Sequence, residues 1–357
     1  ELVRVNTNIL EKQYLQEGDL LICARNGSRN LVGKCAIIDN LNEPTSFGAF
    51  MAVCRSALNP WIFQILNSEY FNTYLDDSNS TAINQVTQKM LLAFQLPIPP
   101  AAEQERIISK LKQWYEYIDE IEDRKIELES YIKQTKSKIL DLAISGKLVP
   151  QDPNDEPAIE LLKRINPDFK PCDNSHYENL PFEVPDGWCW ATLGSIGKWQ
   201  SGATPSRMRK DYYGGDIPWL KTGDLNDWYI TDIPEYITQQ ALNETSVKLN
   251  PAGSILIAMY GATIGKIGIL TMPATTNQAC CACISHNGIE QMYLFYYLLS
   301  HKEEFVRQGG GGAQPNISKE KIVETLIPIP PLSEQLRIIK AIEAIFNQID
   351  NITAELS

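Results

Sequence analysis

The most regular pattern in the chain is a narrow apolar stripe that occurs in two separate stretches. In the first stretch, apolar side chains alternate at spacings of four and three from Ile107 to Leu142, with interruptions at Lys125 and Thr135. The second stretch keeps the same phase, at Ile338, Ile342, Ile345, Ile349, Ile352 and Leu356. A stripe this narrow, sustained over several heptads, indicates a coiled coil rather than a helix lying on a globular core. We therefore predict two long helices that are able to pair with each other.

The same motif precedes both stretches. Residues 96–108 read LPIPPAAEQERII, and residues 327–339 read IPIPPLSEQLRII. The prolines fix φ and remove backbone donors, so the chain should arrive extended and become helical only after them. Glu103 then falls in or near the first turn, where a carboxylate meets the positive end of the helix dipole. An internal repeat of this kind fixes the architecture before any local prediction is made.

The sequence before each motif also repeats in order. A short apolar strand, a Gly-Lys turn, an amphipathic helix and a helix N-cap follow one another in both halves. The matching pairs are Gly18–Ala24 with Gly253–Met259, Gly33-Lys34 with Gly265-Lys266, Pro60–Leu75 with Met292–Phe305, and Thr87 with Ser318. Residues 183–252 have no counterpart before Gly18. We therefore expect the first domain to lack several dozen N-terminal residues, and the second helix to be cut short at Ser357.

This organisation predicts a mixed α/β fold with two similar domains separated by long helices that form an antiparallel coiled-coil spacer. Between the halves, residues 146–157 combine a helix stop with a polar linker, and a short helix is expected at residues 158–165. The predicted parts are 1–96 for the C-terminal part of the first domain, 97–145 for the first spacer helix, 146–182 for the linker, 183–327 for the second domain, and 328–357 for the truncated second helix.

Composition adds three constraints. A hydrophobic content of 43% is ample for real cores, whereas a net charge of −12 provides no global basic field for nucleic acid. The eight cysteines show no disulfide-type spacing, which fits a reducing, cytoplasmic location. The most apolar window, residues 253–270, contains Lys266 and several glycines, so it reads as two strands with a turn rather than a membrane span.

Three motifs that superficially suggest enzyme chemistry have better structural explanations. Residues 261–267 resemble a phosphate-binding loop, but they are one residue short and Ile267 replaces the magnesium-binding hydroxyl. Cys280 and Cys281 are adjacent on a predicted strand and point to opposite faces, which disfavours a shared zinc ion; we expect buried thiols there. The stretch Asn59–Ile62 echoes an amino-methyltransferase motif but lacks its second proline. We predict a non-catalytic chain without cofactor or metal.

A binding protein with two similar domains suits a ligand that itself presents two sites at a fixed distance, as duplex DNA does. A continuous helix from Glu103 to Ser145 would run roughly 60 Å at about 1.5 Å per residue. Such a spacer could hold two reading domains about one helical turn of DNA or more apart.

These residues resemble a known family. The duplicated motif, together with residues 145–150 (SGKLVP), 185–194 (PDGWCWATLG) and 202–206 (GATPS), is similar to the specificity subunits of type I restriction–modification enzymes. The resemblance implies two target recognition domains, each reading half of a bipartite double-stranded DNA site, with two antiparallel helices between them. It also implies methyltransferase subunits as partners on this scaffold, and restriction endonuclease subunits that join them to form the nuclease.

The acidic net charge is compatible with this function because local lysines and arginines supply the phosphate contacts. The candidate DNA-binding residues flank Gly-rich turns in both halves: Arg25, Arg29, Lys34, Thr204, Ser206, Arg207, Arg209, Lys210, Tyr260, Lys266 and Gln278. Two other interpretations remain open. One is a coiled-coil adaptor that binds only proteins, and the other is a DNA-recognition fragment of a fused restriction–methyltransferase.

Overall fold

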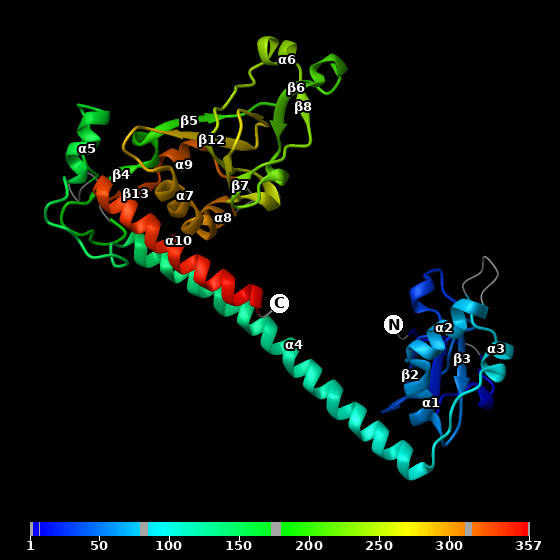
Figure 1. Cartoon of the computed structure of the whole chain (residues 1–357). Helices are drawn as coiled ribbons and strands as arrows, with labels where there is room; N and C mark the ends of the chain where they lie inside the picture. The colour runs from blue at the N-terminus through cyan, green and yellow to red at the C-terminus, as the bar shows by residue number, and fades with distance from the viewer. Residues whose placement is uncertain (1–2, 7, 79–84, 173–179, 311–315, 356–357) are drawn as a thin grey trace. The chain divides into compact units, whose positions relative to one another are not determined.

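The computed structural model describes residues 3–6, 8–78, 85–172, 180–310 and 316–355. The chain divides into two compact units, Glu1–Ile126 and Glu127–Ser357. One helix, α4 (Ala101–Ile144), begins in the first unit and ends in the second (Figure 1). Across these described ranges, no helix has both the length and the apolar character needed to cross a membrane.

The first unit is built on a three-stranded antiparallel sheet in the order β2-β1-β3. Leu20 and Phe71 are fully buried in one cluster, which joins the central strand to the helices that follow the sheet. The elements before α4 are η1 (Glu11–Gln13), β1 (Leu20–Cys23), η2 (Arg29–Leu31), β2 (Cys35–Ile37), β3 (Met51–Cys54), α1 (Asn59–Leu66), α2 (Glu69–Ser78) and α3 (Gln88–Ala93).

The second unit contains a five-stranded sheet in the order β5-β12-β9-β10-β7. Its three inner strands alternate in direction, whereas β7 pairs parallel with β10. The alternating side chains of β12 enter two different cores, Cys281 and Cys283 on one face and Cys280 and Ala282 on the other. The strands are β5 (Gly197–Ser201), β7 (Tyr229–Ile230), β9 (Ile255–Ala258), β10 (Ile267–Leu270) and β12 (Cys280–Ser285).

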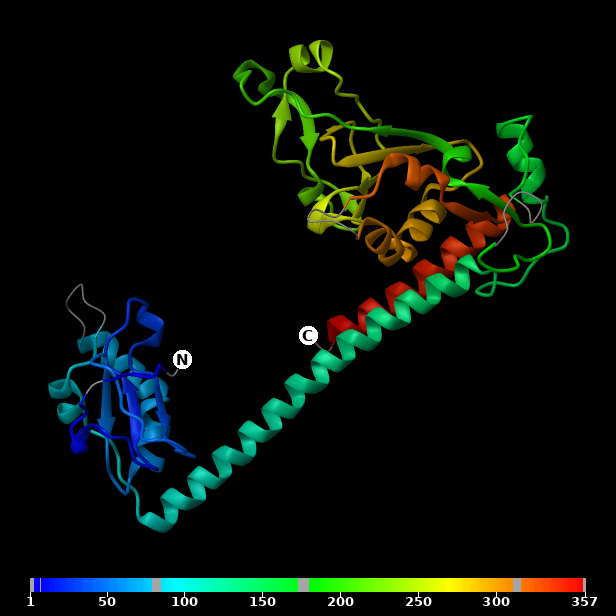
Figure 2. The ribbon, with the colours of Figure 1, turned by 180° about the vertical axis from the view of Figure 1, so that it is seen from behind.

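Two smaller sheets complete this unit. Strands β6 (Tyr213–Leu220), β8 (Tyr236–Ile237) and β11 (Thr275–Thr276) form one, and β4 (Cys189–Thr192) pairs with β13 (Leu326–Ile329) in the other. Strands β6 and β8 and helix α6 (Gln239–Glu244) lie at the end of the unit farthest from α10 (Figures 1 and 2). Short 3-10 turns connect several strands: η3 (Leu193–Ser195), η4 (Lys210–Tyr212), η5 (Thr222–Asp224) and η6 (Gly261–Thr263).

Helices cover the five-stranded sheet on the side of α10. Buried Tyr293 and Phe295 of α7 share one core with Ile338 and Ile342 of α10, so α7 packs between the sheet and α10 (Figure 1). The helices of this unit other than α4 and α6 are α5 (Ala158–Ile165), α7 (Gln291–Ser300), α8 (Lys302–Gly309), α9 (Lys319–Glu324) and α10 (Leu332–Glu355).

The predicted pairing of the two long helices is confirmed over the last turns of α4. Ile139 of α4 lies in the same buried core as Ile338, and Lys136 pairs with Asp350 farther along α10. Because the numbering rises along one helix as it falls along the other, the pair is antiparallel. Among the earlier residues of the predicted stripe, Trp114, Ile118 and Ile121 are exposed, whereas Ile107 and Leu111 are half-buried.

The predicted internal repeat is visible in the backbone. The order strand, 3-10 turn, strand, strand, helix, helix, short helix occurs from β1 to α3, and it recurs from β9 to α9 with the two-residue strand β11 inserted before β12. In both copies the residue just before the second strand accepts a hydrogen bond from the end of the first strand. The bond runs from Cys23 N to Lys34 O at 2.8 Å, and from Ala258 N to Lys266 O at 2.8 Å. The predicted N-caps are confirmed too: Thr87 accepts from Met90 N and Ser318 from Lys321 N.

Both copies of the proline motif are fastened to their own unit in the same way. In the first unit, the Trp61 indole donates to the carbonyl of Pro97 at 2.8 Å. In the second, the Tyr293 hydroxyl donates to the carbonyl of Pro328 at 2.7 Å. The chain is extended here, as expected, and the second copy forms strand β13. Each motif is therefore tied to the helix that follows its sheet.

One local prediction was wrong in both halves. The expected helix over Pro60–Leu75 is split into α1 and α2, and the expected helix over Met292–Phe305 is split into α7 and α8. Polar side chains at each break compete with the helical hydrogen bonds: Ser68 Oγ donates to the Ile65 carbonyl at 2.6 Å, and Ser300 Oγ donates to the Tyr297 carbonyl at 2.7 Å. The apolar spacing continues through both breaks, so periodicity alone could not reveal them.

Candidate nucleic-acid interface

One of the predicted DNA-contact residues, Arg207, is stacked on two aromatic rings. Arg207, Tyr213, Trp219, Lys221 and Glu235 form a group that we call the Arg207 cluster. β6 carries the two rings and pairs with β8 through a register shift between Tyr213 and Ile217. Irregularities of this kind re-aim side chains on a strand, and they recur beside functional sites.

Arg207 is fixed from two directions. Its guanidinium carbon lies 4.4 Å from the centroid of the Tyr213 ring and 5.0 Å from that of Trp219. Both rings are themselves anchored to the turn that carries Arg207. The Trp219 indole donates to the Ala203 carbonyl at 3.0 Å, and the Tyr213 hydroxyl donates to the Pro205 carbonyl at 2.5 Å. The guanidinium of arginine presents a planar fork of N–H donors that matches the oxygens of a carboxylate or phosphate. Its stacking on aromatic rings holds this fork in place.

Glu235 offsets part of the positive charge of this group in the free chain. Its carboxylate accepts from both terminal nitrogens of Arg207 and forms an ion pair with Lys221 Nζ at 2.6 Å. The hydrogen bond from Arg207 lowers the pKa of Glu235, and that of Arg207 is raised in turn. The cluster therefore contains two cations and one carboxylate, with all three charges in contact.

Arg209 has a similar environment. It pairs with Asp211 at 2.6 Å and with Glu244 at 3.4 Å, and it lies 4.3 Å from the centroid of the Tyr212 ring. The Tyr212 hydroxyl also donates to Glu244 at 2.9 Å, which is the main reason that the pKa of Tyr212 is raised. Arg209 is thus held by carboxylates on both sides.

Four other predicted residues lie on the same turn or beside it. Thr204 donates to the side chain of Gln278, so these two distant positions are brought together. Ser206 accepts the backbone hydrogen bond of Arg209 at 3.1 Å, and its side chain is exposed, as is that of Lys210. The predicted residues from Thr204 to Lys210, together with Gln278, therefore share one end of the second unit.

Tyr260 and Lys266 lie on either side of the turn between β9 and β10. Tyr260 is 43% exposed and forms an isolated bridge with Asn316. Between described residues, no hydrogen bond, ion pair or ring contact joins these two side chains to the Arg207 cluster. Their positions match those of Arg25 and Lys34 in the first unit, because Arg25 forms the equivalent bridge with Gln85.

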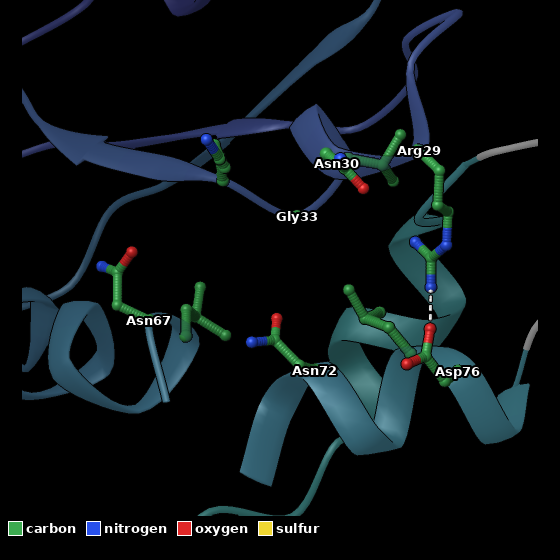
Figure 3. A pocket seen from close by; sticks show the side chains of 10 residues that line it. Arg29, Asn30, Gly33, Asn67, Asn72 and Asp76 are labelled. Carbon is green, nitrogen blue, oxygen red and sulfur yellow. Dashed lines mark hydrogen bonds and ion pairs between the residues drawn. The ribbon is translucent and has the colours of Figure 1, made fainter. Parts of the chain in front are cut away.

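Two of the three predicted residues of the first unit, Arg29 and Lys34, line a pocket of about 410 Å³ (Figure 3). Figure 3 shows η2 and Gly33 on one side of it, with Asn72 of α2 and Asn67, which follows α1, opposite. Arg29 and Asp76 form an ion pair of 2.6 Å across the pocket, and Lys34 also lines it. Arg25 lies outside, with its guanidinium 5.6 Å from the centroid of the Phe50 ring. The pocket therefore combines two cations, a carboxylate and three asparagine amides (Asn30, Asn67 and Asn72).

Comparison with known proteins gives the family. The model of the type I restriction modification DNA specificity domain matches residues 2–130 and again residues 185–357, which together make up most of the chain. The chain belongs to this family.

As expected for a type I DNA specificity protein, its relatives are specificity subunits. It is 32% identical over 173 residues to the EcoR124I/EcoR124II specificity subunit of Escherichia coli, an alignment that covers 47% of this chain and 43% of that protein. It is 34% identical over 175 residues to the MjaIX specificity subunit of Methanocaldococcus jannaschii, covering 47% and 40%. These alignments span less than half the length of either relative.

The fold is shared with solved structures. The HsdS subunit of Thermoanaerobacter tengcongensis aligns over 96% of this chain and 75% of its own, with a TM-score of 0.57 and 19% identity. A chain from a type I R-M system aligns over 96% and 77%, with a TM-score of 0.68 and 19% identity. At this level of identity the likeness supports the architecture of two specificity domains.

The specificity protein buries the cysteines that superficially suggested zinc. Cys280, Cys281 and Cys283 are at most 1% exposed, and burial raises the pKa of Cys281 to about 12. Among the described residues, no group of three or more potential ligands is placed to hold a metal ion. The interpretation of these thiols as small apolar core residues is confirmed.

The sequence does not predict the carboxylates of the candidate interface. Glu235 lies 28 residues from Arg207, and Asp76 lies 47 residues from Arg29. Only the pairing of β6 with β8, and the packing of α2 against η2, bring these residues together. No local motif signals either pair.

Proposed function

We propose that this chain is a sequence-specific DNA-binding subunit of a type I restriction–modification complex that reads a bipartite site. The observation that carries the proposal is the duplicated unit: one backbone order occurs twice, and one family of DNA specificity domains matches both copies. Because duplex DNA offers equivalent grooves at fixed intervals, two similar domains on one chain suit two half-sites. We assign 1–96 and 183–327 as the target recognition domains, with 97–145 and 328–357 as spacer helices and 146–182 as linker.

The Arg207 cluster supports DNA as the ligand. Arginines that stack on aromatic rings beside exposed turns supply contacts to DNA phosphates and base edges. The acidic residues elsewhere in the chain make its net charge negative without changing these local contacts. We propose the same role for Arg209 and for the cations of the first unit, Arg25, Arg29 and Lys34. The other proposed contacts of the second unit are Thr204, Ser206, Lys210, Tyr260, Lys266 and Gln278.

We also propose that the chain is non-catalytic and works as a scaffold in the cytoplasm. In this proposal methyltransferase subunits bind the spacer helices and restriction endonuclease subunits join them. The relatives are named as specificity subunits of restriction enzymes, which supports a division of labour in which reading and chemistry lie on separate chains.

The test is a methylome of the host that carries the intact gene. Deleting the gene should abolish methylation at one bipartite sequence while other methylation patterns persist, and restoring the gene should restore it. If every methylated motif survives the deletion, the proposed function is wrong. Survival of every methylated motif is the outcome expected for an adaptor that binds only proteins.

A further inference from the structure

The free chain holds Arg207 and Lys221 in a contact that DNA would have to break. Both carboxylate oxygens of Glu235 are engaged, one by Arg207 and the other by Arg207 and Lys221. The side chain of Glu235 is 22% exposed, whereas those of Arg207 and Lys221 are 53% and 44% exposed. The two cations thus face solvent, and the carboxylate lies behind them.

Glu235 is not needed to place Arg207. The guanidinium already rests on Tyr213 and Trp219, and these rings are hydrogen-bonded to Pro205 and Ala203 of the turn that carries the arginine. A carboxylate and a DNA phosphate present the same kind of paired oxygens to a guanidinium fork. Glu235 therefore occupies the donors that a phosphate would use.

We propose that Glu235 is an internal competitor of the DNA phosphate, which keeps the second recognition domain from binding non-target DNA tightly. This inference rests on the proposed function. A random duplex offers mainly phosphate contacts, so it gains little by displacing a carboxylate that already satisfies the same cations. A target duplex adds base contacts from the neighbouring turn, and these stabilise the state in which Arg207 and Lys221 are released to the backbone.

The proposal predicts that removing the charge of Glu235 strengthens non-target binding. Measured on the full chain by fluorescence anisotropy, Glu235→Gln should raise the affinity for a random duplex of about 30 base pairs about tenfold at roughly 50 mM salt. The slope of log K against log salt should steepen by about one to two, one for each cation that is freed. Adding Arg207→Gln to Glu235→Gln should remove most of that gain.

A matched control separates this local effect from net charge. Glu129→Gln makes the same change in charge on an exposed position of α4, and it should leave affinity within about twofold. Circular dichroism melting checks that Glu235→Gln remains folded, and Glu235→Ala provides a second variant if the amide disturbs the cluster.

The outcomes distinguish the two proposals. If the wild-type chain binds DNA and both Glu235 variants bind equally or more weakly, Glu235 merely orients Arg207, and the competitor role is wrong while the proposed function stands. If neither the wild-type chain nor the Glu235 variants bind any duplex, both proposals fail together. Tighter binding with a steeper salt slope, reversed by Arg207→Gln, supports both.

Discussion

Replacing Glu334 by alanine should loosen the junction between the second proline motif and the segment that leads into β4. Glu334 is 1% exposed, and its carboxylate accepts from the Trp188 indole at 2.9 Å and from the Gln151 amide at 2.5 Å. Gln151 is exposed, so in the alanine variant water can replace the carboxylate as the acceptor for its side-chain amide. Trp188 is only 8% exposed, so its indole N–H is left buried without an acceptor.

The expected cost follows from these contacts. An orphaned buried donor costs about 1–3 kcal/mol, and hydrogen bonds to a charged group contribute about 1.5–3 kcal/mol each. Against this, burial of the carboxylate is itself unfavourable, and this desolvation raises the pKa of Glu334 above its ordinary 4.5. With that offset, we expect Glu334→Ala to lower the local free energy of unfolding by about 2 kcal/mol.

The raised pKa also fixes the sign of the pH dependence. A carboxyl group whose pKa is higher in the folded state contributes its stability fully below the unfolded value of 4.5, and loses it as pH rises through the folded value. The advantage of the wild-type chain over Glu334→Ala should therefore be largest at acidic pH and shrink as pH rises above 4.5. An advantage that grows across this range would contradict the assigned cause of the shift.

Hydrogen exchange on the full chain is the appropriate assay, because a chain with two units does not unfold as a single two-state system. Exchange in peptides covering residues 182–190 and 326–340 should speed up in Glu334→Ala, while peptides of β1 in the first unit remain unchanged. In a Trp188→Phe background the same alanine substitution should cost about 1–2 kcal/mol less. Additive costs in that double-mutant cycle would refute the coupling between Trp188 and Glu334.

Three further predictions concern the interface, the spacer and the first unit. Replacing both Arg207 and Arg209 by glutamine should weaken DNA binding. In a salt series, the slope of log K against log salt should become shallower by about one for each lost phosphate contact. Inserting four residues after Leu128 should change or destroy the gap of the methylated site without altering either half-site, as read from the methylome. Gly33→Ala should destabilise the first unit by about 1–3 kcal/mol, measured by hydrogen exchange in peptides of that unit, because φ is +87° and the new Cβ would lie 2.7 Å from Leu75 Cδ1.

Features encoded in local sequence could be predicted well. The N-caps at Thr87 and Ser318, the helix at 158–165 and the start of each long helix follow from a capping hydroxyl, an apolar period or a pair of prolines. The breaks at Ser68 and Ser300 were missed because the apolar spacing runs through them. There a single side-chain hydrogen bond to a carbonyl outweighs the helical pattern.

The candidate interface was only half predictable. Its cations could be identified because they cluster beside Gly-rich turns, but their partners depend on tertiary structure. Arg207 reaches Glu235 only through the irregular pairing of β6 and β8, and Arg29 reaches Asp76 only through packing of α2. The sequence therefore predicts the cations, and the structure adds the carboxylates that pair with Arg207 and Arg29.

The repeat separates positions that build the fold from positions that are free to differ. The backbone bonds at Lys34 and Lys266 coincide in length, and Arg25 and Tyr260 form equivalent bridges, although their side chains differ entirely. A lysine in both copies is suited to a phosphate, which is identical at every base pair, whereas an arginine in one copy and a tyrosine in the other suit contacts that vary with sequence. Under the proposed function, one scaffold would thus present the same backbone anchor in two units while each unit reads a different half-site.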